Sequence, residues 1–127
     1  MALDQEQQDR AEEQIRAAEL SPEEVFDVRW ARSIMERSLD RLREEYFRRG
    51  KTSVFEALSP FLQGRPEDSE YQDSAATLGI SIPAVKMNVM RMRKRFALLF
   101  REEVLTTIGD EDQLEHEISH LMSLFGR

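Results

Sequence analysis

Apolar side chains recur at intervals of three and four residues along most of this chain, and this spacing restricts its fold more than any other feature. The longest series comprises Val28, Ala31, Met35, Leu39, Leu42 and Tyr46. Residues spaced in this way lie on one side of an α-helix, whereas a half-buried strand would alternate with a period of two. Because no segment alternates in that manner, the pattern predicts an all-α fold.

Residues with strong preferences for helix ends divide the chain further. The segment Ser21-Pro22-Glu23-Glu24 predicts a helix start, with Ser as the cap, Pro at the first position and Glu three residues after the cap. This helix is expected to end at Gly50, and a shorter helix is expected over about residues 52–62. A further cap is predicted at Ser69, with Gln72 completing a capping box.

The first long helix carries a second apolar stripe, formed by Phe26, Trp30 and Ile34, well around the cylinder from the first. A helix that is apolar on two sides is either deeply buried or shares one side with a partner. The stripe therefore predicts either packing under the last helix or a docking surface for another protein.

The formal net charge of −7 hides a basic segment. Residues 74–101 contain no acidic side chain and six basic ones, namely Lys86, Arg91, Arg93, Lys94, Arg95 and Arg101. The flanking segments, 52–73 and 102–127, are both acidic. A local excess of cations matters more for binding a polyanion than the total charge does. The segment is therefore either a nucleic-acid surface or a solvated helix face that pairs with acidic neighbours.

Three residues in this region have the spacing of a helix-turn-helix. Ala75 is small enough for two helices to touch, and Gly79, four residues later, suits a turn that needs a positive φ. Val85, six residues further on, supplies an apolar contact that holds the second helix. Ser81 is expected to cap that helix. Each residue alone is uninformative, but together they predict a helix-turn-helix.

Successive residues of the second helix are about 100° apart, which assigns its faces. The expected core face comprises Val85, Val89, Met92, Phe96 and Leu99. The opposite side comprises Pro83, Lys86, Met87, Met90, Arg91 and Lys94, with Asn88, Arg93 and Arg95 on the flanks. The helix thus presents cations outward, and its amino-terminal end is expected to enter a DNA major groove.

These residues resemble region 4 of extracytoplasmic-function sigma factors. The resemblance covers about residues 69–105 and rests on Leu78-Gly79-Ile80-Ser81, Ala84-Val85-Lys86 and Arg91-Met92-Arg93-Lys94-Arg95. It implies a domain that binds double-stranded promoter DNA at the minus-35 element and docks on the flap of the RNA polymerase β subunit. An anti-sigma factor would be a further partner.

The resemblance also implies which residues read DNA, namely Lys86, Met87, Asn88, Met90 and Arg91. The acid-free stretch adds Arg93, Lys94 and Arg95 as contacts to phosphates or groove edges. Many relatives have Ser and Arg where this chain has Met87 and Asn88. Met87 cannot donate a hydrogen bond, whereas Asn88 has the amide that suits adenine.

The expected organisation has four parts. They are a flexible acidic segment (1–20), a helical lead-in (21–63), the helix-turn-helix (69–105) and a C-terminal helix (110–125). No aromatic-rich basic segment, of the kind that region 2 of a sigma factor uses to melt DNA, precedes residue 69. We therefore expect either a fragment of a longer sigma factor or a naturally shortened relative.

The segment His116-Glu117-Ile118-Ser119-His120 has the H-E-x-x-H pattern of zinc peptidases, in which two imidazoles one helical turn apart hold the metal. Both histidines are expected to face away from the apolar side of the last helix, which includes Ile118. The chain has no other histidine and no cysteine to complete a site. We expect an exposed helix turn here, with no metal, cofactor or catalytic residue.

Composition narrows the remaining alternatives. The lack of cysteine excludes disulfides and thiolate chemistry, and the longest apolar run, residues 96–100, is too short to span a membrane. We expect a cytoplasmic protein that acts in transcription and is not an enzyme. Two alternatives stay open: an adaptor or anti-sigma-like protein that binds polymerase or a sigma factor, and an independent dimeric helix-turn-helix regulator.

Overall fold

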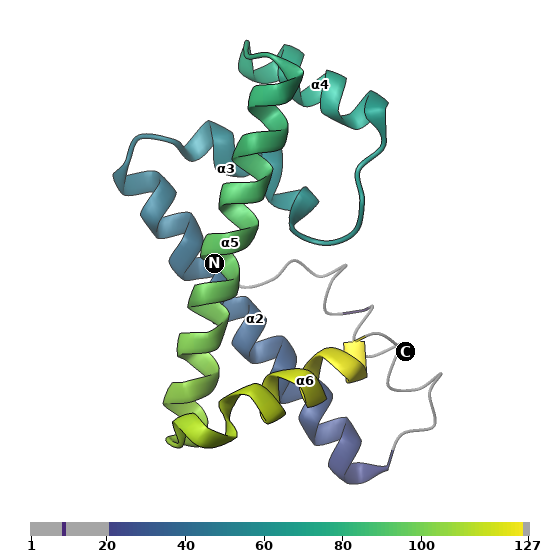
Figure 1. Ribbon diagram of the computed structural model, residues 1–127, viewed down its shortest axis with the longest axis vertical. Coiled ribbons are helices and arrows are strands. Elements are labelled where there is room, and N and C mark those ends of the chain that lie inside the picture. The colour runs from purple at the N-terminus through teal and green to yellow at the C-terminus, as the bar shows by residue number, and fades with distance from the viewer. Residues whose placement is uncertain (1–8, 10–20, 126–127) are drawn as a thin grey trace. The chain divides into compact units, whose positions relative to one another are not determined.

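The computed structural model describes Asp9 and residues 21–125, and the elements of the latter range are all helical (Figure 1). They are α2 (Pro22–Arg48), α3 (Thr52–Leu58), the 3-10 helix η1 (Ser59–Leu62), α4 (Asp68–Leu78), α5 (Ile82–Ile108), the 3-10 helix η2 (Glu111–Gln113) and α6 (Leu114–Phe125). No strand occurs among the described residues, which confirms the predicted all-α class. Apart from Asp9, the predicted flexible segment 1–20 lies outside the described residues.

The ends of α2 follow the predicted signals. The backbone N–H of Glu24 donates to Ser21 Oγ at 3.2 Å, and the backbone N–H of Ser21 donates to Glu24 Oε1 at 3.3 Å. This reciprocal pair satisfies amide groups that have no partner within the first turn of a helix. At the other end, Gly50 has φ 69°, a left-handed conformation that glycine adopts without a Cβ penalty.

Two predicted boundaries are wrong in detail. The capping box of α4 belongs to Glu67 and Glu70 rather than to Ser69 and Gln72, and the Glu67 N–H donates to Glu70 Oε1 at 3.0 Å. Glu67 has the extended backbone of an N-cap, with φ −79° and ψ 161°, so Ser69 already lies inside the helix. The predicted helix 52–62 also changes to a 3-10 helix at Ser59, because Pro60 has no N–H to continue the α-helical pattern.

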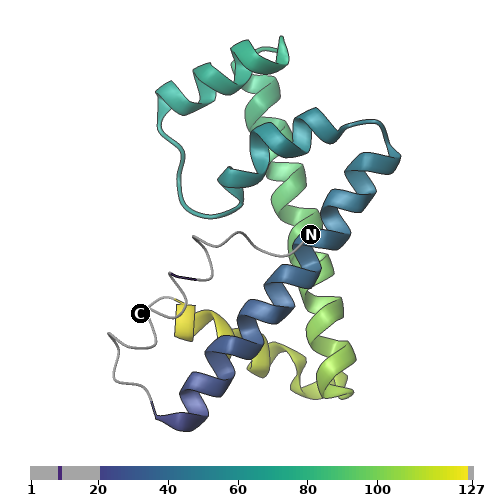
Figure 2. The same ribbon diagram turned by 180° about the vertical axis from the view of Figure 1, so that it is seen from behind.

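The described helices form two compact units, and α2 and α5 each contribute to both. Unit 2 spans Arg41–Leu99. Its core gathers aromatic and aliphatic side chains from α2, α3, η1, α4 and α5, namely Leu42, Tyr46, Phe55, Leu58, Phe61, Ala75, Val85, Val89, Met92 and Leu99. Seen from opposite sides, Figures 1 and 2 both place α3 beside the first half of α5. This core holds the first half of α5 against α3.

Unit 1 combines the chain up to Asp40 with the chain from Phe100 onward. Its buried residues are Val28, Ala31, Ile34, Ser38, Phe100, Val104, Leu114 and Leu121. The one hydroxyl in this group, that of Ser38, donates to the Ile34 carbonyl at 2.7 Å, so its burial leaves no polar group unsatisfied.

The stripe of Phe26, Trp30 and Ile34 does not form one surface. Ile34 is fully buried in unit 1, Trp30 is half-buried, and Phe26 is 69% exposed. The two predicted alternatives therefore apply to different residues: Ile34 packs in the core, and a docking surface stays a prediction for Phe26. Exposure along the stripe increases toward the amino-terminal end of α2, and only Phe26 presents most of its surface to solvent.

Candidate nucleic-acid interface

The corner between α4 and α5 is built around a left-handed glycine. Gly79 has φ 67° and ψ 34°, as predicted, and the N–H groups of Gly79 and Ile80 both donate to the Ala75 carbonyl. This closes the carboxyl end of α4. Ser81 then caps α5 as predicted, because its Oγ accepts from the Ala84 N–H at 3.2 Å. Ala75 and Val85 are both buried, in agreement with their predicted contact roles.

The first half of α5 has distinct inner and outer faces. Val85, Val89, Met92 and Leu99 are buried and Phe96 is half-buried, so the predicted core face is confirmed. The opposite face exposes Lys86, Met87, Met90, Arg91 and Lys94. The side chains of Arg91 and Lys94 form no hydrogen bond or ion pair within the described part of the chain. Their charges are therefore available to an anionic partner.

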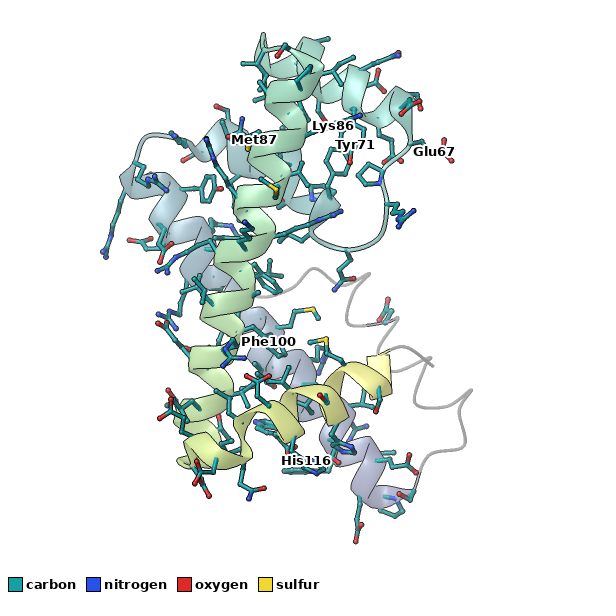
Figure 3. The ribbon with its side chains drawn as sticks, viewed as in Figure 1. Glu67, Tyr71, Lys86, Met87, Phe100 and His116 are labelled. Atoms are coloured by element: carbon teal, nitrogen blue, oxygen red, sulfur yellow. The ribbon has the colours of Figure 1, made fainter. Side chains whose placement is uncertain are left out.

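Lys86 lies at the junction of α4 and α5. Its Nζ lies 5.1 Å from the centre of the Tyr71 ring, which comes from α4 (Figure 3). An ammonium over the face of a tyrosine is attracted by the π electrons of the ring. Tyr71 in turn packs 6.0 Å from the ring of Phe61, one of the buried residues of unit 2. The lysine is thus held near the start of the exposed face, with its amino group still exposed.

Asn88 is not presented as freely as the residues around it. It is half-buried, and its side-chain amide donates to the Ala84 carbonyl at 2.8 Å. A bidentate adenine contact uses this amide as one donor and one acceptor, and here the amide nitrogen is directed back along the helix. In contrast, Met87 and Met90 are 45% and 44% exposed and present their thioether ends outward.

The two flanking arginines are engaged within unit 2. Arg93 donates from Nε to the Phe61 carbonyl at 2.8 Å and from Nη2 to the Gly64 carbonyl at 2.7 Å. It therefore joins α5 to the segment that leaves η1. Arg95 forms a two-pronged ion pair with Glu45 of α2, with distances of 2.8 and 2.6 Å. These contacts give both residues a structural role beside the predicted DNA role.

The ion pair of Arg95 changes the acidity of its partner. The hydrogen bond from Arg95 lowers the pKa of Glu45, although partial burial acts in the opposite direction. The charges of Arg95, Arg41 and Arg49 lower that pKa further. Glu45 is therefore held as a carboxylate among cations, where it neutralises part of their charge.

A second group of cations was not among the predicted site residues. Arg48, Arg49 and Lys51 lie where α2 ends and α3 begins, and all three are exposed. The sequence carries a signal for them, because residues 29–51 contain eight basic and four acidic side chains. That excess could not be assigned to a surface until the turn between the two helices was known.

The two histidines lie on α6, in unit 1. His120 Nε2 lies 2.9 Å from Asp27 Oδ2, and His116 is exposed on the same helix (Figure 3). His120 was expected to face away from the packed side, but it is half-buried against Asp27 of α2. Among the described residues, no three His, Cys, Asp or Glu side chains are placed to hold a metal ion.

Comparison with known proteins does not indicate a function for this chain. No protein-family model, curated protein or solved structure matches the chain. Within the described residues, no helix is long and apolar enough to cross a membrane. The first part of α5, residues 82–101, has an exposed face that combines cations with thioethers and carries no carboxylate. Such a face can bind a polyanion.

Proposed function

We propose that this chain is a DNA-binding module of transcription initiation, similar to region 4 of extracytoplasmic-function sigma factors. In this proposal α4, the Gly79 corner and α5 act as a helix-turn-helix, and the first half of α5 enters the major groove of minus-35 promoter DNA. The module is not an enzyme. One observation carries the proposal: an acid-free helix face, opposite the core, that begins directly after a left-handed glycine corner.

The outward and flanking residues of α5 have three roles in this proposal. Arg91 and Lys94, without internal partners in the described part of the chain, contact phosphates or acceptor atoms of bases, and Lys86 does so from the α4 side. Met87 and Met90 give apolar contacts of the kind that thymine methyl groups accept. Arg93 and Arg95 contribute mainly to the positive field, because their guanidinium groups already bond to Phe61, Gly64 and Glu45.

A DNA titration with the full chain tests this proposal. We expect binding of duplex DNA to weaken as salt increases, with each removed phosphate contact lowering the slope of log K against log salt by about 0.9. The double variant Arg91→Ala/Lys94→Ala should therefore lose affinity and reduce the slope by about two. Arg65→Ala, an exposed cation in the loop before α4, is the matched control and should leave the slope unchanged. Equal slopes for the wild type and the double variant would place the DNA surface elsewhere.

RNA polymerase is the second partner in this proposal. An isolated module of this size binds DNA weakly, and attachment to polymerase raises its effective concentration at the promoter. Two exposed phenylalanines are available for the contact, Phe26 in unit 1 and Phe47 in unit 2, with exposed fractions of 69% and 66%. Capture of the β-subunit flap by the wild type, by Phe26→Ala and by Phe47→Ala would assign the docking site to one unit.

The exposed apolar side chains also favour a second candidate, a protein that binds another protein through α5. Met87, Met90 and Leu98 are all at least 44% exposed on this helix, and large apolar side chains concentrate binding energy at interfaces. A mass measurement separates a self-associating regulator from a monomer. Binding of a sigma factor or polymerase with no measurable DNA affinity would favour the adaptor or anti-sigma-like alternative.

A further inference from the structure

The turn between α2 and α3 carries three cations within four residues, Arg48-Arg49-Gly50-Lys51. All four residues are exposed, and Gly50 has a left-handed conformation that lets the chain reverse direction sharply. Arg48 pairs with Glu44 at 3.0 Å, whereas the side chains of Arg49 and Lys51 form no hydrogen bond or ion pair within the described residues. The turn therefore presents two cations, Arg49 and Lys51, whose side chains are unpaired.

The end of α2 that leads into this turn contacts α5. Glu45 of α2 pairs with Arg95 of α5 at 2.8 and 2.6 Å, and the backbone N–H of Arg49, one helical turn later, donates to the Glu45 carbonyl at 3.2 Å. The turn therefore follows directly on the part of α2 that is held against α5. Arg43, whose Cζ lies 5.3 Å from the centre of the Phe55 ring, adds a further cation between α2 and α3.

In both views, α4 lies on the other side of the first half of α5 from the α2–α3 turn, and the amino-terminal end of α4 is acidic (Figures 1 and 2). The first turn of α4 exposes Glu67, Asp68 and Glu70, and Asp73 is exposed one turn later. A helix N-terminus normally attracts phosphate, but here carboxylates surround it and the capping box of Glu67 and Glu70 occupies it. Phosphates would therefore be repelled on the α4 side and attracted on the side of the α2–α3 turn.

We propose that Arg49 and Lys51 form a phosphate-binding clamp that holds the DNA backbone beside the groove occupied by α5. This inference rests on the proposed function and adds a second, sequence-independent contact surface to it. The clamp fixes the orientation of the duplex, because phosphate contacts position a protein on DNA without reading its sequence. Charge complementarity selects the occupant, since Arg49 and Lys51 are exposed cations on a turn whose preceding helix is held against α5 by the pair of Glu45 and Arg95.

The test compares salt slopes for a mixed-sequence DNA duplex and the full chain. Arg49→Ala/Lys51→Ala should reduce the slope by about two, with the same proportional loss of affinity for duplexes of different sequence. Arg65→Ala is again the control for removal of an exposed cation in unit 2. Arg49→Gln/Lys51→Gln keeps the long side chains and should behave like the double alanine variant. Circular dichroism and thermal unfolding establish that each variant is folded.

The outcomes separate the two proposals. If Arg91→Ala/Lys94→Ala weakens binding but both Arg49/Lys51 variants retain the wild-type slope, the clamp is wrong and the proposed function stands. In that case the cations serve only the carboxyl end of α2, where positive charge favours the helix dipole, and the variants lose stability without losing slope. If the wild-type chain binds no duplex at any salt concentration, both proposals are overturned.

Discussion

At the scale of single residues, the arginines of α5 differ in what their charge is used for. Arg91 is exposed without an internal partner in the described part of the chain, whereas Arg93 bonds to two backbone carbonyls and Arg95 pairs with a carboxylate. These arginines are nearly adjacent in sequence, yet only the side chain of Arg91 is unpaired, whereas Arg93 and Arg95 connect parts of unit 2. Arginines that look equivalent in the sequence therefore differ in their contacts, which depend on the residues that surround each side chain.

Arg93→Ala should destabilise the protein much more than Arg91→Ala. Loss of two hydrogen bonds from a charged donor is expected to cost about 1–3 kcal/mol, whereas removal of an exposed, unpaired cation should change stability by less than about 0.5 kcal/mol. Urea unfolding measures this difference. DNA titration should show the reverse contrast between stable proteins, with Arg91→Ala the more defective. Equal stability losses would show that the Arg93 contacts contribute little.

Glu45→Gln should release Arg95 and raise DNA affinity. The bidentate pair is partly exposed, so solvent screening limits its contribution to about 0.5–1 kcal/mol. Because the folded pKa lies below the ordinary 4.5, the stabilisation is present above pH 4.5 and is lost as the pH falls through the folded value. Unfolding measured at neutral and acidic pH checks this sign. Glu44→Gln, which removes the more exposed pair with Arg48, is the control and should have a smaller effect on stability.

At the scale of elements, the α4–α5 corner depends on a single backbone conformation. A Cβ at Gly79 would meet nothing within 4 Å, so the cost of a substitution comes from the positive φ alone. Gly79→Val should therefore lose about 1–2 kcal/mol of stability, together with DNA binding. Gly79→Asn should lose less, because asparagine tolerates this region. Thermal unfolding and DNA titration of both variants test this prediction. A Gly79→Val variant with the stability and DNA affinity of the wild type would show that the corner does not depend on the left-handed conformation.

The helices also show which structural features could be predicted from the sequence and which could not. Signals that act within one helical turn predicted the capping of α2 by Ser21, the left-handed Gly79 and the faces of α5. The start of α4 was predicted two residues too late, because the sequence offers two overlapping capping boxes, Glu67 with Glu70 and Ser69 with Gln72. The partners of Arg93 and Arg95 could not be predicted, because they lie 29, 32 and 50 residues away in sequence. Such pairings depend on how helices pack, which no periodicity within one helix contains.

At the scale of the whole molecule, an acidic chain is expected to bind a polyanion through a local basic surface. Residues 1–20 contain six acidic and two basic side chains, so their removal changes the formal net charge from −7 to −3. Deletion of 1–20 should raise DNA affinity at about 50 mM salt, and the gain should shrink at about 200 mM because salt screens the repulsion. Replacement of the six acids by their amides is the control. A gain that is independent of salt would point to a contact rather than to charge.

In the proposed function, the lack of carboxylates in residues 82–101 of α5 has a consequence for the composition of the DNA that this helix would select. Cytosine presents an amino donor in the major groove, and the side chains that accept from it are Asp and Glu. Residues 74–101 contain neither. Lys86, Arg91 and Lys94 can only donate, which suits the two acceptors of guanine, while Met87 and Met90 suit the thymine methyl group. Sites recovered from a random pool should therefore be asymmetric, with guanine and thymine concentrated on the strand that faces the helix.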